Sequence, residues 1–375
     1  MQYIKRFNIS LLVLLIFFSL SACKTIQPTP PTVSDKPKTE QSRKNDLQTD
    51  HKTKTAQKEQ SEQDKENKQQ QSKPPKAIDY EKVKPNELGE IMVVMYHYFG
   101  DKEQEFTRTF DNFRKDLKVL YDKGYRLISL DDFLNNNIAV PAGTTPIIFT
   151  FDDGPASQFN LIEKDGKLVV NPESAVGIMM EFNKQYPDFG LEGTFYINEV
   201  AFSGSRGTEK ERLQYLLELG MDVGNHTFGH TNLGQADPDT IQKVIGKHVA
   251  KMKEFFPNYK NNTLSLPYGA YSDTTFDYVK RGTYENIQYK NDSVLLVGWK
   301  PSPAPAHKNF YPLKLLRVRA GEGVQHDMYY YLDYFDKNPN MKYISDGDKD
   351  TVCFPEDMKG QLDAEKVGNK KVITY

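Results

Sequence analysis

The stretch PIIFTFDDGP, residues 146–155, decides the expected fold. Ile147 to Phe149 form a short β-branched and aromatic run, typical of a buried strand. The run ends in two adjacent carboxylates, Asp152 and Asp153, followed by a Gly-Pro turn. Such a turn by itself indicates only the end of a strand. The surrounding chain makes the two acids candidates for a functional site.

Strand and helix patterns alternate on both sides of this stretch. The other segments expected to form strands are residues 91–98, 125–130, 193–198, 221–224 and 294–299. Strands that alternate with helices form a parallel α/β layer, whose active sites lie at the carboxyl ends of the strands. Asp152 and Asp153 stand at such an end.

Local signals add detail to this α/β layer. An Asp165-Gly166 turn predicts an inserted hairpin within residues 156–171. Thr208 and Glu211 form the pattern of a capping box, which starts a helix. Asp131 or Asp132 is expected to cap a short helix that runs through Leu134.

The hexapeptide NHTFGH, residues 225–230, follows one of the predicted strands directly. His226 and His230 are four residues apart, which on a helical turn places both imidazoles on one face, within reach of one metal ion. An HxxxH pair alone is weak evidence, but this pair lies in the same layer as Asp153. Two histidines and an aspartate leave a coordination position open, as catalytic metal sites do.

TFDDGP and HTFGH, with GTFYI between them, resemble the motifs of the polysaccharide deacetylases of carbohydrate esterase family 4, the NodB-homology group. The resemblance extends over roughly residues 91–319. It implies an α/β fold, a distorted (β/α) barrel with seven strands. It also implies removal of N- or O-acetyl groups from polymers of acetylated sugars.

The resemblance assigns roles to the acids and histidines of the two motifs. Asp153, His226 and His230 would bind a divalent metal, usually zinc in this family, with cobalt, nickel or manganese as alternatives. Asp152 would be the general base. The chemistry agrees, because a divalent ion lowers the pKa of bound water and polarises the acetyl carbonyl, while a neighbouring carboxylate takes the proton of the attacking water.

A third motif of the family, Arg-x-Pro-Tyr-Gly, is matched in part by residues 265–269. Pro267 and Tyr268 match, so the resemblance places Pro267 at the substrate and makes the backbone N–H of Tyr268 the oxyanion donor. Ser265 stands where the family has an arginine that pairs with the base. Either activity is slower in this chain, or another basic residue fills the space.

The remaining two family motifs leave alternatives open. Trp299 corresponds to a tryptophan in the wall of the acetyl pocket, but as the only tryptophan of the chain it is equally a candidate core residue. His326, in Val-Gln-His, is the nearest match to the histidine that protonates the leaving amine, and His307 competes for this role.

The N-terminus has the pattern of a bacterial lipoprotein. Lys5 and Arg6 precede an apolar run that closes on Leu-Ser-Ala-Cys, so residues 1–22 are expected to be a signal peptide and Cys23 the lipidated N-terminus. The run is short for a retained membrane span. A lipid anchor would place the protein on the extracytoplasmic face of the cell membrane.

Composition divides the rest of the chain. Polar residues 23–78 cannot bury enough apolar surface to order and are expected to form a flexible tether. The barrel is expected over 79–327, with a C-terminal extension over 328–375 packed on it. Lys and Arg number 49 against 51 Asp and Glu, unlike a nucleic-acid-binding protein, and we expect a monomer without nucleic acid.

The sequence therefore predicts a lipid-anchored, metal-dependent N-deacetylase that acts on peptidoglycan or a related N-acetylglucosamine polymer. Two other functions remain open. Ser265 and the unclear general acid favour a catalytically impaired glycan-binding lipoprotein. An O-acetyl ester hydrolase is the third possibility.

Overall fold

The computed structural model describes residues 78–375 and contains a curled parallel sheet. The predicted signal peptide and lipidated Cys23 lie outside this range, as does the tether up to residue 77. Seven parallel strands follow one another across the sheet in this order: β13 (Ser293–Leu295), β10 (Thr263–Ser265), β9 (Asp222–Asn225), β8 (Thr194–Ile197), β5 (Thr145–Asp153), β1 (Glu90–Tyr96) and β15 (Val318–Arg319). The predicted seven-stranded α/β barrel is confirmed.

One short segment links the two edges of this sheet. Leu315 donates its N–H to the carbonyl of Val294 and accepts from the N–H of Leu296, both at 2.8 Å, at the β13 edge. Three residues later the same segment enters β15 and pairs with β1. Two further strands, β14 (Ser302–Pro303) and β4 (Tyr125–Leu127), pair with the starts of β1 and β5. Residues 315–319 therefore close the barrel.

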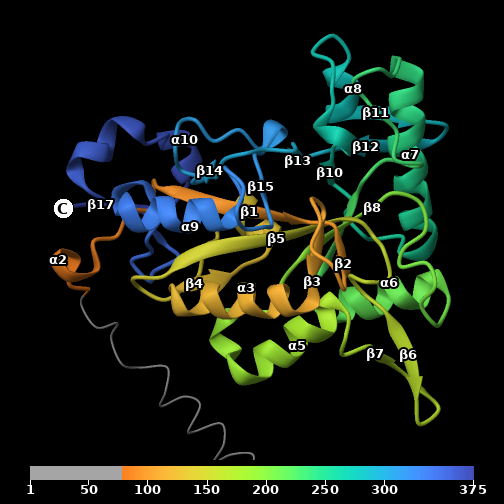
Figure 1. Ribbon diagram of the computed structural model, residues 1–375. Helices are drawn as coiled ribbons and strands as arrows, with labels where there is room; N and C mark the ends of the chain where they lie inside the picture. Colours follow the sequence, from red (N-terminus) through yellow and green to blue (C-terminus); the bar gives the residue numbers. More distant parts are fainter. Residues whose placement is uncertain (1–77) are drawn as a thin grey trace, which may run out of the picture. The chain divides into compact units, whose positions relative to one another are not determined.

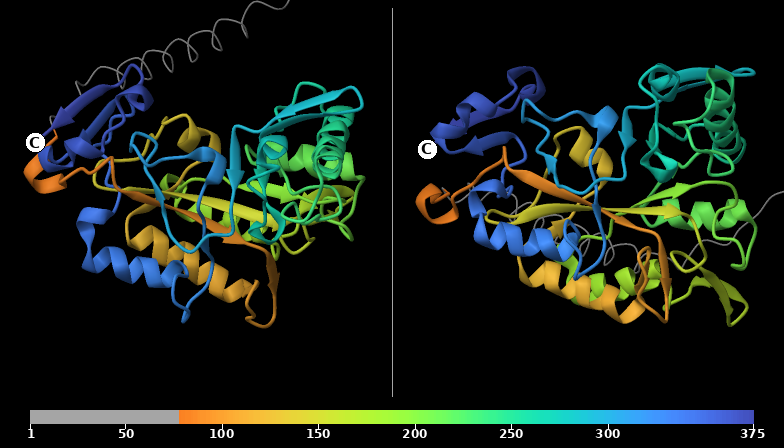
Figure 2. Two further views of the ribbon diagram at one scale, coloured as in Figure 1. Left: turned by 90° about the horizontal axis from the view of Figure 1, so that it is seen from above. Right: turned by 45° about the horizontal axis from the view of Figure 1, so that its top comes forward.

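Helices cover the outer face of the barrel (Figures 1 and 2). One core joins the sheet to α3 (Phe110–Asp122), α5 (Ala175–Gln185), α6 (Glu209–Glu218) and α9 (Met328–Lys337). A second core joins β10 and β13 to α7 (Pro238–Phe255) and α8 (Phe276–Lys280). Every second strand residue faces these helices, so the alternate residues face the inside of the barrel.

The inward-facing residues change from apolar to polar along each strand. In β5 they are Ile148, Thr150 and Asp152, in that order, and Ile148 belongs to the apolar cluster inside the barrel. In β1, Ile91 and Val93 belong to the same cluster. The apolar part fills the amino-terminal end of the barrel, and the polar part is concentrated at the carboxyl ends of the strands.

Two local predictions are confirmed and two are corrected. The hairpin of β6 (Leu161–Lys164) and β7 (Lys167–Val170) turns at Asp165 and Gly166, and the capping box forms at the start of α6. Helix α4 (Leu130–Leu134) is capped by Ser129 instead of an aspartate, because the Ser129 hydroxyl accepts the N–H of Asp132. The predicted strand 294–299 ends at Leu295, since its next residues pair with Leu315 and then enter a loop.

The chain after α9 forms a small layer of its own. It contains a parallel pair, β16 (Thr351–Phe354) and β17 (Lys371–Thr374), together with the short helix α10 (Ala364–Val367). Besides several short 3-10 helices, the remaining elements of residues 78–375 are α2 (Tyr80–Val83), β2 (Tyr98–Gly100), β3 (Thr107–Thr109), β11 (Arg281–Tyr284) and β12 (Ile287–Lys290). Within residues 78–375, no helix is both long and apolar enough to span a bilayer.

Glu87 is a buried acid that ties this C-terminal layer to the chain before β1. Its carboxylate accepts the backbone N–H of Cys353 at 2.9 Å and of Asp346 at 3.2 Å. Burial, with Asp346 nearby, raises the pKa of Glu87 to about 7. The folded protein therefore binds a proton here more tightly than the unfolded chain, so this stabilisation is complete below the unfolded pKa and is lost as the pH rises through 7.

We expect Glu87→Gln to flatten the pH dependence of stability. The melting temperature of the unmodified protein should fall between pH 5 and pH 8 as Glu87 ionises, and the uncharged variant should lose part of this fall. Thermal unfolding of both proteins across this range is the measurement. An equal fall in the two proteins would contradict the assignment.

Candidate active site

Three potential metal ligands meet at the carboxyl ends of β5 and β9. Asp153 Oδ1 lies 3.5 Å from His226 Nε2 and 3.4 Å from His230 Nε2, and one ligand atom from each residue lies within 4.8 Å of the others. Two ligand atoms at about 2.1 Å from a tetrahedral zinc ion are about 3.4 Å apart. Both distances from the Asp153 carboxylate fit one such ion.

The backbone at Asp153 explains how it joins the histidines. Adjacent residues of a regular strand point to opposite faces, so Asp152 and Asp153 would normally be separated by the sheet. Asp153 has a φ of 75° and Gly154 a φ of 66°, which ends the strand in a sharp turn. Left-handed backbone at a non-glycine residue is uncommon and concentrates at functional sites.

The histidine pair does not lie on a helical turn, so this part of the prediction is wrong. The segment after β9 is an irregular loop, in which Thr227 has a φ of 57° and His230 a φ of 52°. The Asn225 side chain accepts the Thr227 N–H at 2.8 Å and fixes the loop. These local bonds and left-handed residues exclude a helix, yet the loop still brings both imidazoles together.

The two histidines have different surroundings. His226 is 2% exposed, and its Nδ1 lies 2.8 Å from the carbonyl oxygen of Ser265, so Nδ1 is the protonated nitrogen and Nε2 is free to bind a metal. His230 is 31% exposed and its ring lies 4.7 Å from that of Tyr268. Burial lowers the pKa of His230, which favours the neutral form that metal binding requires.

Asp152 is buried beside this cluster and held by an arginine. It is 1% exposed, and Arg317 donates from Nη1 to Oδ1 at 2.7 Å and from Nη2 to Oδ2 at 2.8 Å. The Ser265 hydroxyl donates to Oδ2 at 2.9 Å. Burial alone would raise the pKa of Asp152, but Arg317 and the nearby histidines hold it well below its usual range. Asp152 is therefore ionised at neutral pH.

Arg317 is a site residue that was not identified from the sequence. It answers the question left by Ser265, because its guanidinium fills the space above the serine and pairs with the same aspartate. The available signal was an arginine inside the apolar, strand-like run LLRVRA, residues 315–320. A charged residue between apolar neighbours at strand spacing points into the barrel there.

His97 is the second residue that was missed. It follows β1 on the inward face, and its Nε2 lies 3.9 Å from Asp152 Oδ2. Its ring packs 4.8 Å from that of Phe106, and burial lowers its pKa. The signal was a histidine at the carboxyl end of the first predicted strand, the same position in the layer that identified the aspartates.

The third motif lies beside the histidines. Pro267 is buried, and Tyr268 has a φ of 59° with a side chain that is 67% exposed. Within residues 78–375, no backbone acceptor is found for the Tyr268 N–H. A free N–H in a fixed, left-handed turn next to His230 suits an oxyanion donor.

Trp299 and His326 are placed differently. Trp299 is 69% exposed in the loop after β13, and its carbonyl accepts from the Tyr331 hydroxyl. His326 Nδ1 lies 3.3 Å from the same hydroxyl. Among the described residues, no hydrogen bond or ion pair joins either residue to Asp152 or to the three potential ligands. Their assigned roles remain predictions, as does that of His307, which bonds to the Asn309 N–H.

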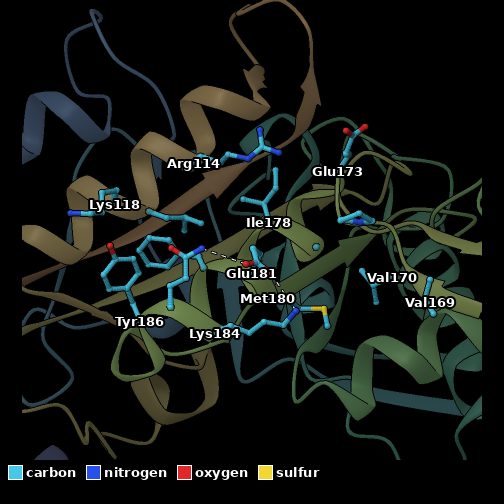
Figure 3. Close-up of a pocket in the computed structure, with 15 residues that line it drawn as sticks. Arg114, Lys118, Val169, Val170, Glu173, Ile178, Met180, Glu181, Lys184 and Tyr186 are labelled. Atoms are coloured by element: carbon cyan, nitrogen blue, oxygen red, sulfur yellow. Dashed lines mark hydrogen bonds and ion pairs between the residues drawn. The ribbon is translucent and has the colours of Figure 1, made fainter. Parts of the chain in front are cut away.

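A separate cavity of about 850 Å³ lies between α3 and α5 (Figure 3). Leu117, Ile178 and Phe182 contribute apolar side chains, and Lys118 and Lys184 lie among its lining residues. None of the aspartates and histidines described above lines this cavity, so we do not include it in the site.

A comparison with known protein families agrees with the motifs. Residues 139–287 match the family model described as polysaccharide deacetylase. Among solved structures, the Streptococcus pyogenes deacetylase PplD in complex with acetate matches at 19% identity and a TM-score of 0.48, over 65% of this chain and 97% of that chain. A putative polysaccharide deacetylase from Bacillus anthracis matches at 16% identity and a TM-score of 0.46, over 65% and 68%.

A de-N-acetylase from Aggregatibacter actinomycetemcomitans also matches, at 13% identity and a TM-score of 0.44, over 65% of this chain and 99% of that chain. No curated protein matches the sequence significantly. The resemblance that the two motifs indicated is confirmed: residues 139–287 match the polysaccharide deacetylase family.

Proposed function

We propose that this protein is a metal-dependent deacetylase that removes acetyl groups from an N-acetylated glycan of the cell envelope. The proposal depends mainly on a cluster of three potential metal ligands that lies beside a buried carboxylate. Asp153, His226 and His230 offer three ligand atoms at distances that fit one ion, and Asp152, ionised and held, stands next to them. The match of residues 139–287 to the polysaccharide deacetylase family supports the reaction class.

Four residues of the site have separate parts in the proposed reaction. A divalent ion, when bound, would supply Lewis acidity towards the acetyl carbonyl and lower the pKa of water. Asp152, as the general base, accepts the proton of the attacking water. The backbone N–H of Tyr268 donates to the carbonyl oxygen as negative charge develops there. Ser265 and Arg317 keep the base carboxylate in place.

The leaving amine also needs a proton, and we propose His97 as its donor. His97 is the histidine that faces Asp152 in the buried part of the site, whereas His326 contacts Tyr331 of α9. A donor must come within hydrogen-bond reach of the leaving group, and the position of His97 beside the base supports this role.

Single variants of His97 and His326 show which of the two histidines is the general acid. We expect His97→Asn to lower kcat by about 10²-fold or more, in the range of general acid catalysis, while His326→Asn stays within about twofold of the unmodified protein. Steady-state acetate release is the measurement, with zinc content as a control for the integrity of the site. The opposite order of effects would return the role to His326.

The substrate is proposed from location and family. The lipoprotein pattern that ends at Cys23 would hold the protein at the extracytoplasmic membrane face, where peptidoglycan and related N-acetylglucosamine polymers are in reach of a flexible tether. The metal is proposed to be zinc. The Arg317 pair favours an active enzyme over an impaired glycan-binding protein, because the absence of an arginine at Ser265 was a main reason for that alternative.

The test is acetate release from peptidoglycan and N-acetylglucosamine oligomers, with O-acetylated xylan in parallel. The proposal expects metal-dependent release from the N-acetylated substrates. Release from xylan alone would favour the ester hydrolase. Binding without release from any substrate would favour the glycan-binding protein.

A further inference from the structure

We propose that Arg317 is a positioning residue, brought in by the segment that closes the barrel, which fixes the general base Asp152 in its working orientation. The inference rests on the proposed function, since it concerns the base of that reaction. It goes beyond it by assigning the role of the missing arginine to a residue 52 positions further along the chain than Ser265.

The hydrogen bonds of Arg317 are complete. A guanidinium has five N–H groups, and all five have an acceptor here. Besides its two bonds to Asp152, it donates to Ser265 Oγ at 2.8 Å, to Thr150 Oγ1 at 3.2 Å and to the Leu296 carbonyl at 2.8 Å. The side chain is 0% exposed. Such a network allows one guanidinium orientation and therefore one carboxylate orientation.

The acceptors of Arg317 come from three strands of the barrel or the residues next to them. Thr150 and Asp152 belong to β5, Ser265 ends β10, and Leu296 follows β13. Arg317 itself lies between Leu315, which bonds to the β13 edge, and Val318, which pairs with β1. The base is therefore positioned only when the barrel is closed, because the same segment closes the sheet and supplies the arginine.

The contacts of Ser265 indicate that an arginine at position 265 could take the place of Arg317. Its Oγ contacts both Asp152 and Arg317, so a side chain starting at this position reaches the same carboxylate. Ser265 is 0% exposed and its Oγ already accepts from Arg317 Nη2, so an arginine at position 265 would compete with Arg317 for the same space. The small serine at position 265 therefore leaves room for the arginine at position 317.

The first experiment moves the arginine. We expect Arg317→Met to lower kcat by about 10²-fold, the scale of a misplaced catalytic group, with zinc content and KM nearly unchanged. Arg317→Lys should recover little, since an ammonium cannot bond both oxygens as a planar fork does. The double variant Arg317→Ser with Ser265→Arg should regain most of the lost kcat. Arg126→Met, which removes an arginine of β4 paired with Asp188, is the matched control.

The second experiment displaces Arg317 without changing it. A Cβ on Gly298 would lie 2.6 Å from both the N and the O of Arg317, whereas one on Gly321 would have no neighbour closer than 3.8 Å. Gly298→Ala should therefore lower kcat as Arg317→Met does, and Gly321→Ala should not. A loss that appears equally in both glycine variants would contradict the proposal.

Crystal structures test the positioning role of Arg317 without relying on acetate release. If the unmodified protein releases no acetate, the proposed function fails, and crystal structures still test the positioning role. They should show the Asp152 carboxylate rotated in Arg317→Met and restored in the double variant. An unchanged carboxylate in Arg317→Met, or full kcat in that variant with active unmodified protein, would overturn the inference.

Discussion

Asp152→Asn is expected to lower kcat for acetate release by about 10²- to 10⁴-fold, the range contributed by general acid–base catalysis. The amide has nearly the same shape as the carboxylate but does not accept a proton at neutral pH. In the unmodified protein Arg317 and Ser265 donate to both carboxylate oxygens of Asp152. The amide of the variant would place an N–H₂ group against one of these donors. Metal binding should remain, because the potential ligands are other residues.

A matched control for this variant is Asp222→Asn. Asp222 lies on strand β9 of the same sheet, is partly buried and accepts from the Tyr259 hydroxyl, but it stands at the opposite end of its strand from His226. The kcat of Asp222→Asn should stay close to that of the unmodified protein. Unreduced turnover in Asp152→Asn, or equal losses in the two variants, would remove Asp152 from the mechanism.

His226→Ala is expected to abolish metal binding at the site and, with it, acetate release. His226 is the more buried of the two histidines, and its orientation is set by the Ser265 carbonyl. Loss of residues that merely support a ligand lowers metal affinity by about 10- to 100-fold, so loss of a ligand itself should exceed that range. Metal content after dialysis and zinc titration are the measurements.

His307→Asn controls for the removal of a histidine. His307 accepts the backbone N–H of Asn309, and among the described residues it is not part of the cluster of potential ligands. Its metal content should match that of the unmodified protein. Full zinc binding by His226→Ala would mean that the ion, if present, is held elsewhere.

The sequence predicted those parts of the site that depend on short motifs. Asp152 and Asp153 are adjacent, and His226 and His230 lie within one pentapeptide, so their residue types and the ends of their strands could be recognised without a structure. The central strands were predictable for a similar reason, because a buried strand of β5 or β1 is a continuous apolar run.

The remaining features depend on long-range packing. Arg317 bonds to an aspartate 165 residues away, and this contact exists only because residues 315–319 close the barrel. His97 required knowledge of which face of β1 is the inner one. The loop that carries His226 and His230 depends on left-handed residues and a side-chain bond from Asn225, whereas their spacing suggested a helix.

We propose that deacetylation requires one divalent ion at Asp153, His226 and His230. The most direct measurement is stepwise addition of zinc to chelator-treated protein, with acetate release from N-acetylglucosamine oligomers and peptidoglycan followed at each step. We expect no acetate release without metal and a linear rise that ends at one equivalent of zinc. Full acetate release by the metal-free protein would contradict it.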